Sequence, residues 1–296
     1  MRHAASRPGT LASWFRRHPL LSYFTLTFGI SWGGILVILA ARGFDLSPIQ
    51  PLEAGLILVA MLLGPSLGGL IVTAIVKGRR GFRELGARLI NWRVGTRWYA
   101  VALLAVPAIL LTILLFLNVL VDPAFAPHFQ WALFAVGLVA GSFEEIGWTG
   151  FVTPRLLAGQ RLGMAGLLLG LTWAFWHLLV DFRYNIDPMG AAWMLEFAIV
   201  YMATLTPYRM LMTWVYGNTQ SLFLAILMHA SFTGWLLVLF PATSLSQSLF
   251  WQSTFALTLW GMVAVVLRGN ALRFDGGRQH APGEVHQKPV EGTRDV

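Results

Sequence analysis

Two adjacent glutamates, Glu144 and Glu145, lie in a stretch of sequence that is otherwise strongly apolar. An ionised carboxylate in hydrocarbon costs about 3 kcal/mol or more, so such residues line a protein interior or a wet cavity and mark a functional site by default. Neighbouring residues on a helix point about 100° apart. We therefore expect one of the two to face a site and the other to support it or to line its entrance.

Two histidines, His177 and His229, lie inside other apolar segments, each with a partner one helical turn away. Trp173 precedes His177 by four residues and Thr233 follows His229 by four, so each pair shares a helix face. A single histidine in a membrane helix is as often a hydrogen-bonded core residue, but two histidines with a carboxylate pair favour a shared site. The candidate site residues are Glu144, Glu145, His177, His229 and Thr233.

Three kinds of chemistry use such a set. A carboxylate with two imidazoles can activate water, the carboxylate taking the proton while a histidine stabilises the oxyanion or protonates the leaving group. Glu144, His177 and His229 could instead ligate a metal, for which zinc is the natural candidate. Both alternatives give hydrolysis, whereas a proton relay in a transporter is the third use. The spacing alone does not choose among them.

The composition is that of a membrane protein. Of 296 residues, 56% are hydrophobic and 11% charged, against about 25% charged in a soluble domain. There are no cysteines, which excludes disulfides, thiolate metal sites and thiol nucleophiles. The net charge of +8 comes from basic residues in short loops, which membrane topology and anionic lipid explain better than a nucleic-acid partner.

The chain is predicted to be an all-α polytopic bundle of about eight transmembrane helices, because it has apolar runs of about 20 residues. A stripe of Phe82, Leu85, Leu89 and Trp92 also predicts a short amphipathic helix on the inner membrane surface. We expect a cytoplasmic segment 1–19, a transmembrane domain 20–268 and a disordered cytoplasmic tail 269–296. The expected spans are 20–41, 54–76, 98–121, 129–152, 163–182, 193–216, 219–240 and 249–267.

The basic residues predict the orientation. With the N-terminus inside, the inner segments hold the dense basic run from Lys77 to Arg97, whereas the outer loops hold Arg42 and Arg183 among acidic residues. Both termini are therefore expected in the cytoplasm, and in a bacterial cell the plasma membrane would be the location. Arg209 is ambiguous in this assignment.

Small residues occur at regular spacings in several spans. Gly29-x-x-x-Gly33 and Gly166-x-x-x-Gly170 predict close helix packing, within the chain or between copies. Gly64-Pro-Ser66-Leu-Gly68 matches a nucleophile-elbow pattern. That elbow needs a strand–turn–helix context, so inside an apolar helix we interpret it as packing.

Three ordered motifs resemble those of the CPBP family, which comprises type II CAAX prenyl proteases and bacteriocin-processing or bacteriocin-immunity proteins. The family motifs are Glu-Glu-x-x-x-Arg, Phe-x-x-x-His and His-x-x-x-Asn. The corresponding segments are Glu144-Glu145-Ile-Gly-Trp-Thr149, Trp173-Ala-Phe-Trp-His177 and His229-Ala-Ser-Phe-Thr233. In architecture the resemblance covers roughly residues 20–268.

The resemblance implies an intramembrane endopeptidase with a conical cavity open to the cytoplasm. Glu144 would activate the water with support from His177, and His229 with Thr233 would stabilise the oxyanion. The substrate would be a membrane-associated or lipidated protein or peptide. Members are often labelled metalloproteases, although a metal-free, glutamate-dependent mechanism is also argued for the prenyl proteases.

Two polar helpers of the motifs are altered. Thr149 stands where the family has arginine, and a threonine cannot supply a guanidinium charge. Thr233 stands where the family has asparagine, and its hydroxyl donates with a shorter reach. A catalytically impaired relative that acts as a membrane scaffold or immunity-type protein is therefore the alternative, followed by a proton-coupled transporter.

Overall fold

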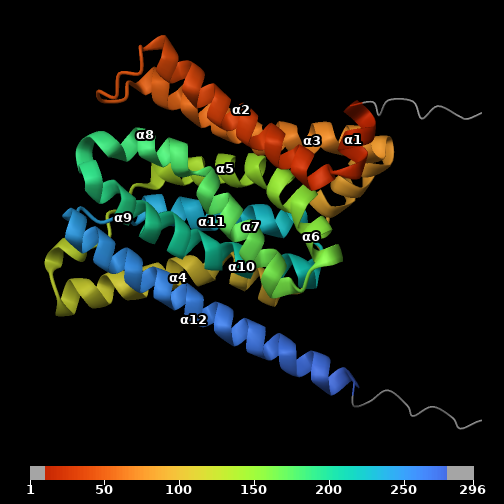
Figure 1. Cartoon of the computed structure of the whole chain (residues 1–296). Coiled ribbons are helices and arrows are strands. Elements are labelled where there is room, and N and C mark those ends of the chain that lie inside the picture. Colours follow the sequence, from red (N-terminus) through yellow and green to blue (C-terminus); the bar gives the residue numbers. More distant parts are fainter. Residues whose placement is uncertain (1–10, 279–296) are drawn as a thin grey trace, which may run out of the picture.

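The computed structural model describes residues 11–278, and the regular elements in that range are helices (Figure 1). Short 3₁₀ turns at Pro123–Phe125, Trp131–Leu133 and Gly190–Ala192 and π-helical segments at Trp148–Val152 and Ala198–Ala203 connect or interrupt them. The α-helices are α1 Leu11–Arg17, α2 Pro19–Ala41, α3 Pro51–Leu89, α4 Thr96–Leu120, α5 Phe134–Gly147, α6 Thr153–Gly159, α7 Leu162–Trp176, α8 Leu178–Met189, α9 Trp193–Phe197, α10 Thr204–Thr219, α11 Leu222–Val238 and α12 Leu245–Arg278.

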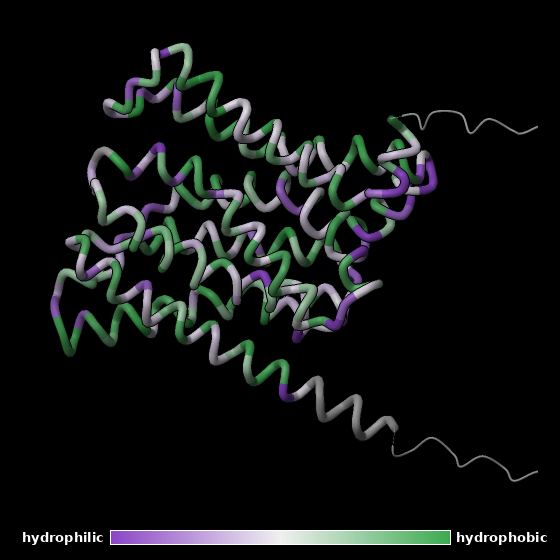
Figure 2. Tube along the Cα trace, in the orientation of Figure 1, coloured by the Kyte–Doolittle hydropathy of each residue, from purple (hydrophilic) through white to green (hydrophobic). Residues whose placement is uncertain are grey.

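The predicted polytopic helical bundle is confirmed. Within the described residues, five helices are long and apolar enough to cross a membrane, and α11 is a shorter apolar helix. Apolar residues predominate along the middle of the long helices in Figure 2. The expected spans at 129–152 and 193–216 are each interrupted by a π-helical segment. The five are Pro19–Ala41, Pro51–Leu89, Thr96–Leu120, Leu162–Ile186 and Leu245–Gly269.

The predicted surface helix is continuous with the second span. Helix α3 runs to Leu89, but Gly78 within it has φ 55° and ψ −142°, a conformation that favours glycine. The chain bends there, and the following turns carry Phe82 and Leu89 half-exposed. Leu85 instead lies against Gly150 of the bundle. The predicted amphipathic segment is therefore the last part of α3 as far as Leu89, and Trp92 lies beyond the end of the helix.

The end of α12 differs from the expected domain boundary. The helix continues to Arg278, beyond the predicted limit at residue 268. The rest of the predicted tail, residues 279–296, lies outside the described residues.

The two ends of the bundle carry different parts of the chain (Figure 1). One end, here called the α1 end, holds α1, α6 and the end of α12. The other, here called the α8 end, holds the connection between α2 and α3, the end of α8 and the start of α12. Each span therefore has one terminus near each end of the bundle. A ligand can reach a buried side chain either from the α1 end or from the α8 end.

Glycines bring together the two helix pairs that carry the candidate site. A Cβ at Gly141 of α5 would be 2.8 Å from the Ala230 backbone nitrogen of α11. A Cβ at Gly170 of α7 would be 2.9 Å from the Thr206 Cα of α10. Only glycine permits such backbone approach, as expected for membrane helices.

The other small-residue patterns have different outcomes. An added Cβ at Gly29 would meet nothing within 4 Å, so this glycine makes no close internal contact. Ser66 is buried, and its single hydroxyl proton is shared between the carbonyls of Leu62 and Phe143, at 3.0 and 2.7 Å. Its hydroxyl therefore holds α3 against α5, in agreement with the packing interpretation.

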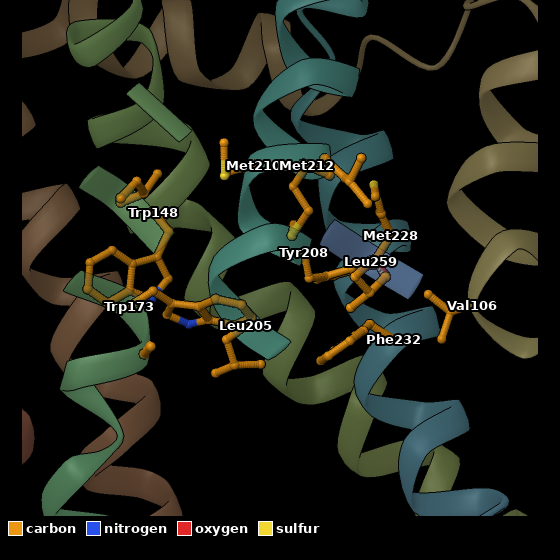
Figure 3. Close-up of a cluster of buried hydrophobic side chains, with 14 of the residues drawn as sticks. Val106, Trp148, Trp173, Leu205, Tyr208, Met210, Met212, Met228, Phe232 and Leu259 are labelled. Carbon is orange, nitrogen blue, oxygen red and sulfur yellow. Dashed lines mark hydrogen bonds between the residues drawn. The ribbon is translucent and has the colours of Figure 1, made fainter. Parts of the chain in front are cut away.

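A buried aromatic and aliphatic core surrounds the pairing of α10 with α11 (Figure 3). The rings of Tyr208 and Phe232 stack with centroids 3.9 Å apart, and the Tyr208 hydroxyl donates to the Met228 carbonyl. Trp173 lies at the other side of this cluster, beside Leu205 in Figure 3. The core therefore positions the helices on which the site residues lie.

Gly170→Ala is expected to destabilise the protein because the new methyl would meet the backbone of α10. Overpacking of this kind costs about 1–3 kcal/mol. The effect is measured as the melting temperature in detergent. It is obtained from the fraction of protein that still elutes as a monodisperse peak in gel filtration after heating. Gly29→Ala is the matched control, since its methyl enters open space and alanine favours helix. Equal melting temperatures for the two variants would contradict the packing role of Gly170.

Candidate functional site

The Glu145 carboxylate is fully buried and is bound from three other positions. Arg209 of α10 donates to both of its oxygens, at 2.8 and 2.9 Å. His229 Nδ1 of α11 lies 2.7 Å from Oε1. The Thr149 hydroxyl donates to Oε2. Two parallel N–H···O bonds make the arginine contact both strong and geometrically specific.

Arg209 supplies the charge that the first motif lacks. Thr149 stands at the motif's arginine position and bonds the carboxylate only as a neutral donor. The cation beside the glutamate pair thus comes from α10 and not from the motif position. The sequence signal for it is an arginine within an apolar segment, and the structure shows this arginine fully buried.

Trp173 joins this ion pair to Glu144. Its ring lies under the Arg209 guanidinium, 4.0 Å from Cζ to the ring centroid, a favourable cation–π geometry. Its indole nitrogen donates to Glu144 Oε2 at 3.0 Å. Tryptophan in place of the motif's phenylalanine thus adds a donor that fixes the orientation of Glu144.

The hydrogen bonds fix how the two imidazoles are presented. His177 Nδ1 lies 2.8 Å from the Trp173 carbonyl, which can only accept, so this nitrogen carries the proton. His229 Nδ1 faces the Glu145 carboxylate and is assigned a proton for the same reason. In both rings Nε2 is the nitrogen left for a ligand, as in sites where one ring nitrogen orients the other. The rings lie 5.5 and 5.3 Å from that of Trp173.

A cavity of about 670 Å³ brings most of the predicted residues together. Glu144, His177, His229 and Thr233 all line it, along with Trp173. Glu145 lies behind this wall and does not line the cavity, so it is a positioning residue. The two adjacent glutamates therefore point in different directions, as their angular separation predicts. Glu144 lines the cavity, and Glu145 binds Arg209 and His229 of the neighbouring helices.

The cavity extends toward the α8 end of the bundle. Its lining includes Pro188 and Met189 at the end of α8 and Phe240, Thr243 and Leu245 between α11 and α12. The start of α2 and the end of α12 lie at the opposite end (Figure 1). The predicted cytoplasmic termini and the predicted opening of the cavity to the cytoplasm both stay predictions.

Besides Glu144, one acidic side chain lines the cavity, and a second, Asp181, lies near it outside the described lining. Glu196 of α9 lines the cavity and is 8% exposed. Asp181 of α8 is held by the side chains of Asn185 and Trp193, each at 2.6 Å. The polar groups of the cavity are therefore acceptors and neutral donors, set among many apolar side chains.

Zinc held by Glu144, His177 and His229 stays a prediction. Within residues 11–278 no group of three His, Asp or Glu side chains is close enough to form a metal site. The three predicted ligands nevertheless line the same cavity, and Nε2 of each histidine is not used by the hydrogen bonds described above.

Removing the cation from the buried pair should be strongly destabilising. Arg209→Met leaves Glu145 uncompensated, which costs about 3–5 kcal/mol. The melting temperature in detergent is expected to fall sharply and to recover in part in Arg209→Met with Glu145→Gln. Arg80→Met is the control, because the exposed Arg80–Glu84 pair contributes little. Equal melting temperatures for the Arg209 and Arg80 variants would contradict this role.

Comparisons with known proteins point to a family of membrane proteases. A family model described as type II CAAX prenyl endopeptidase Rce1-like matches residues 126–235, a range that contains all three motifs. The chain is also 25% identical over 241 residues to CAAX prenyl protease 2 of Methanococcus maripaludis, covering 74% of this chain and 84% of the relative. Together with the motifs and the helical bundle, these matches support the resemblance of the chain to the CPBP family of membrane proteases.

Proposed function

We propose that the protein is an intramembrane endopeptidase that cleaves a membrane-associated polypeptide with water activated by Glu144. The observation that carries the proposal is the position of this carboxylate. It faces the cavity, is oriented by Trp173, and is free of the ion pair that occupies Glu145. A carboxylate held next to a cavity and not neutralised by a cation can act as a general base.

The proposed reaction begins with proton transfer from water to the Glu144 carboxylate. The hydroxide adds to the peptide carbonyl carbon, and the carbonyl oxygen becomes an oxyanion. Collapse of this intermediate breaks the C–N bond, and the proton held by Glu144 passes to the leaving amine. Water is thus divided between the new carboxyl group and the new amine.

His177, His229 and Thr233 are proposed to act on the oxyanion and the leaving group. Thr233 lines the cavity one turn beyond His229 on α11, so both can address one bound carbonyl. Donors aimed at a developing oxyanion typically contribute 10²–10³-fold in rate, about 3 kcal/mol. The Glu145 carboxylate, which contacts His229 Nδ1, would stabilise the positive charge of a doubly protonated His229 ring.

The substrate class follows from the cavity wall. Most of its side chains are apolar and it lies within the membrane-spanning bundle, which suits a hydrophobic or membrane-associated segment. The names of the matched family and relative refer to CAAX prenyl proteins. The apolar lining supports a broader substrate class, namely membrane-associated polypeptides.

Glu144→Gln should abolish hydrolysis without unfolding the protein, because it keeps the shape and the acceptor for Trp173 but cannot take up a proton. The expected loss is about 10²–10⁴-fold. New protein N-termini in membranes of cells that express the wild type or the variant provide the measurement. Glu84→Gln, at the half-exposed Glu84, is the matched control. An unchanged set of termini in Glu144→Gln would sink the protease assignment and favour the scaffold alternative.

Trp173→Phe tests whether the indole N–H orients the base. The variant restores the family's aromatic residue but removes the 3.0 Å hydrogen bond. A hydrogen bond to a charged group is worth about 1.5–3 kcal/mol, so the turnover rate should fall roughly 10–100-fold. The loss should appear in kcat and leave KM nearly constant. A change confined to KM would show that Trp173 only shapes the cavity.

A further inference from the structure

The approach to the site is closed on the α1 side by aromatic rings. Tyr23 of α2 stacks on Phe151 at 5.3 Å and meets Trp148 edge-on at 5.5 Å. Trp176 meets Trp148 at 5.6 Å. All four side chains are at most 1% exposed. Trp148 and Phe151 directly follow the glutamate pair in the direction of α6, so this aromatic cluster separates the site from the α1 end.

The described residues that line the cavity lie toward the α8 end of the bundle. The lining includes the ends of α8 and α11 and the start of α12. Residues of α1, α6 and the turn between α10 and α11 are absent from the described lining. Glu144 is ten residues into α5, which places it about 15 Å from the start of that helix. A substrate therefore reaches the site from the α8 end.

Charge distinguishes the two ends of the bundle. The described basic side chains gather at the α1 end, where Glu84 is the acidic neighbour of several of them. They are Arg16, Arg17, Lys77, Arg79, Arg80, Arg83, Arg88, Arg93, Arg97, Arg155, Arg161 and Arg268. Short loops rich in Lys and Arg remain on the cytoplasmic side of a membrane, so the α1 end is the cytoplasmic one.

The arginines at the α8 end do not counter this assignment, because acidic partners neutralise them. Arg183 and Arg42 both bind Glu53, the former at 2.7 Å, and Arg42 also lies 3.3 Å from Asp45. Arg183 is 1% exposed. These contacts hold α8 against the connection between α2 and α3. Arg42 and Arg183 are therefore both paired with carboxylates.

We propose that the cavity opens on the extracytoplasmic face and that the substrate is a polypeptide segment exposed there. This rests on the proposed protease function and deepens it. A cytoplasmic lipidated tail could not enter from that side. The described lining holds the carboxyl groups of Glu144 and Glu196 and no Lys or Arg, so it also lacks a cation for a free C-terminal carboxylate. An internal segment of a translocated or membrane-spanning polypeptide fits both features.

Cysteine labelling tests the proposal directly, since the chain contains no cysteine. Single variants report on three places. Ala242→Cys lies in the α8-end loop, Leu237→Cys lies in the cavity wall, and Thr96→Cys lies at the start of α4, at the α1 end. Each is produced in a bacterial inner membrane and treated, in right-side-out spheroplasts, with a membrane-impermeant maleimide before and after detergent permeabilisation. Ala242 and Thr96 are exposed, and Leu237 lines the cavity.

The expected result is equal labelling of Ala242→Cys and Leu237→Cys before and after permeabilisation, and a several-fold gain for Thr96→Cys only after it. The reverse pattern, or labelling of Thr96→Cys from outside, would overturn the proposal. Labelling of Ala242→Cys without Leu237→Cys would overturn the open cavity. Repeating the set with Glu144→Gln separates the two proposals, because accessibility does not require hydrolysis and failure of the protease assignment leaves the labelling pattern unchanged.

Discussion

The ion pair between Glu145 and Arg209 is the interaction on which the rest of the site depends. Neither charge could remain alone at full burial, since an unpaired charge in such a setting costs several kcal/mol. Their bidentate contact joins α5 to α10, and His229 binds the same carboxylate from α11. Three helices are thus registered against each other by one buried carboxylate. The close glycine contacts of Gly141 and Gly170 allow this registration.

Neutralising one glutamate changes what the other can do. With Glu145 paired, Glu144 is the carboxyl group that remains for a substrate, and Trp173 separates it from the arginine. The indole plane accepts the guanidinium on its face while its N–H donates to Glu144. The cation therefore stabilises the frame without directly quenching the proposed base. Two identical residues acquire different roles from their environments, a common arrangement in acid–base sites.

Local sequence signals predicted the spans, the glutamate pair and the two histidines, because burial of a polar group in an apolar segment is visible from neighbouring residues. The partner of Glu145 was missed because it lies 64 residues away on α10. A charge balance for the membrane interior could have found it, since a buried carboxylate requires a cation and Arg209 lies within an apolar segment. The π-helical segments at Trp148–Val152 and Ala198–Ala203 depend on packing between helices, which no local pattern encodes.

The direction of access could not be obtained from helix depth alone. Glu144 lies near mid-helix, so its sequence position is compatible with an opening at either end. The opening is decided by what fills the two sides. Tyr23, Trp148 and Phe151 pack together on the side toward the α1 end, whereas on the other side the lining of the cavity reaches the loop after α11. In the proposed assignment, the motif residues supply the chemistry, and charges and loops outside those motifs set the face of the membrane that the site serves.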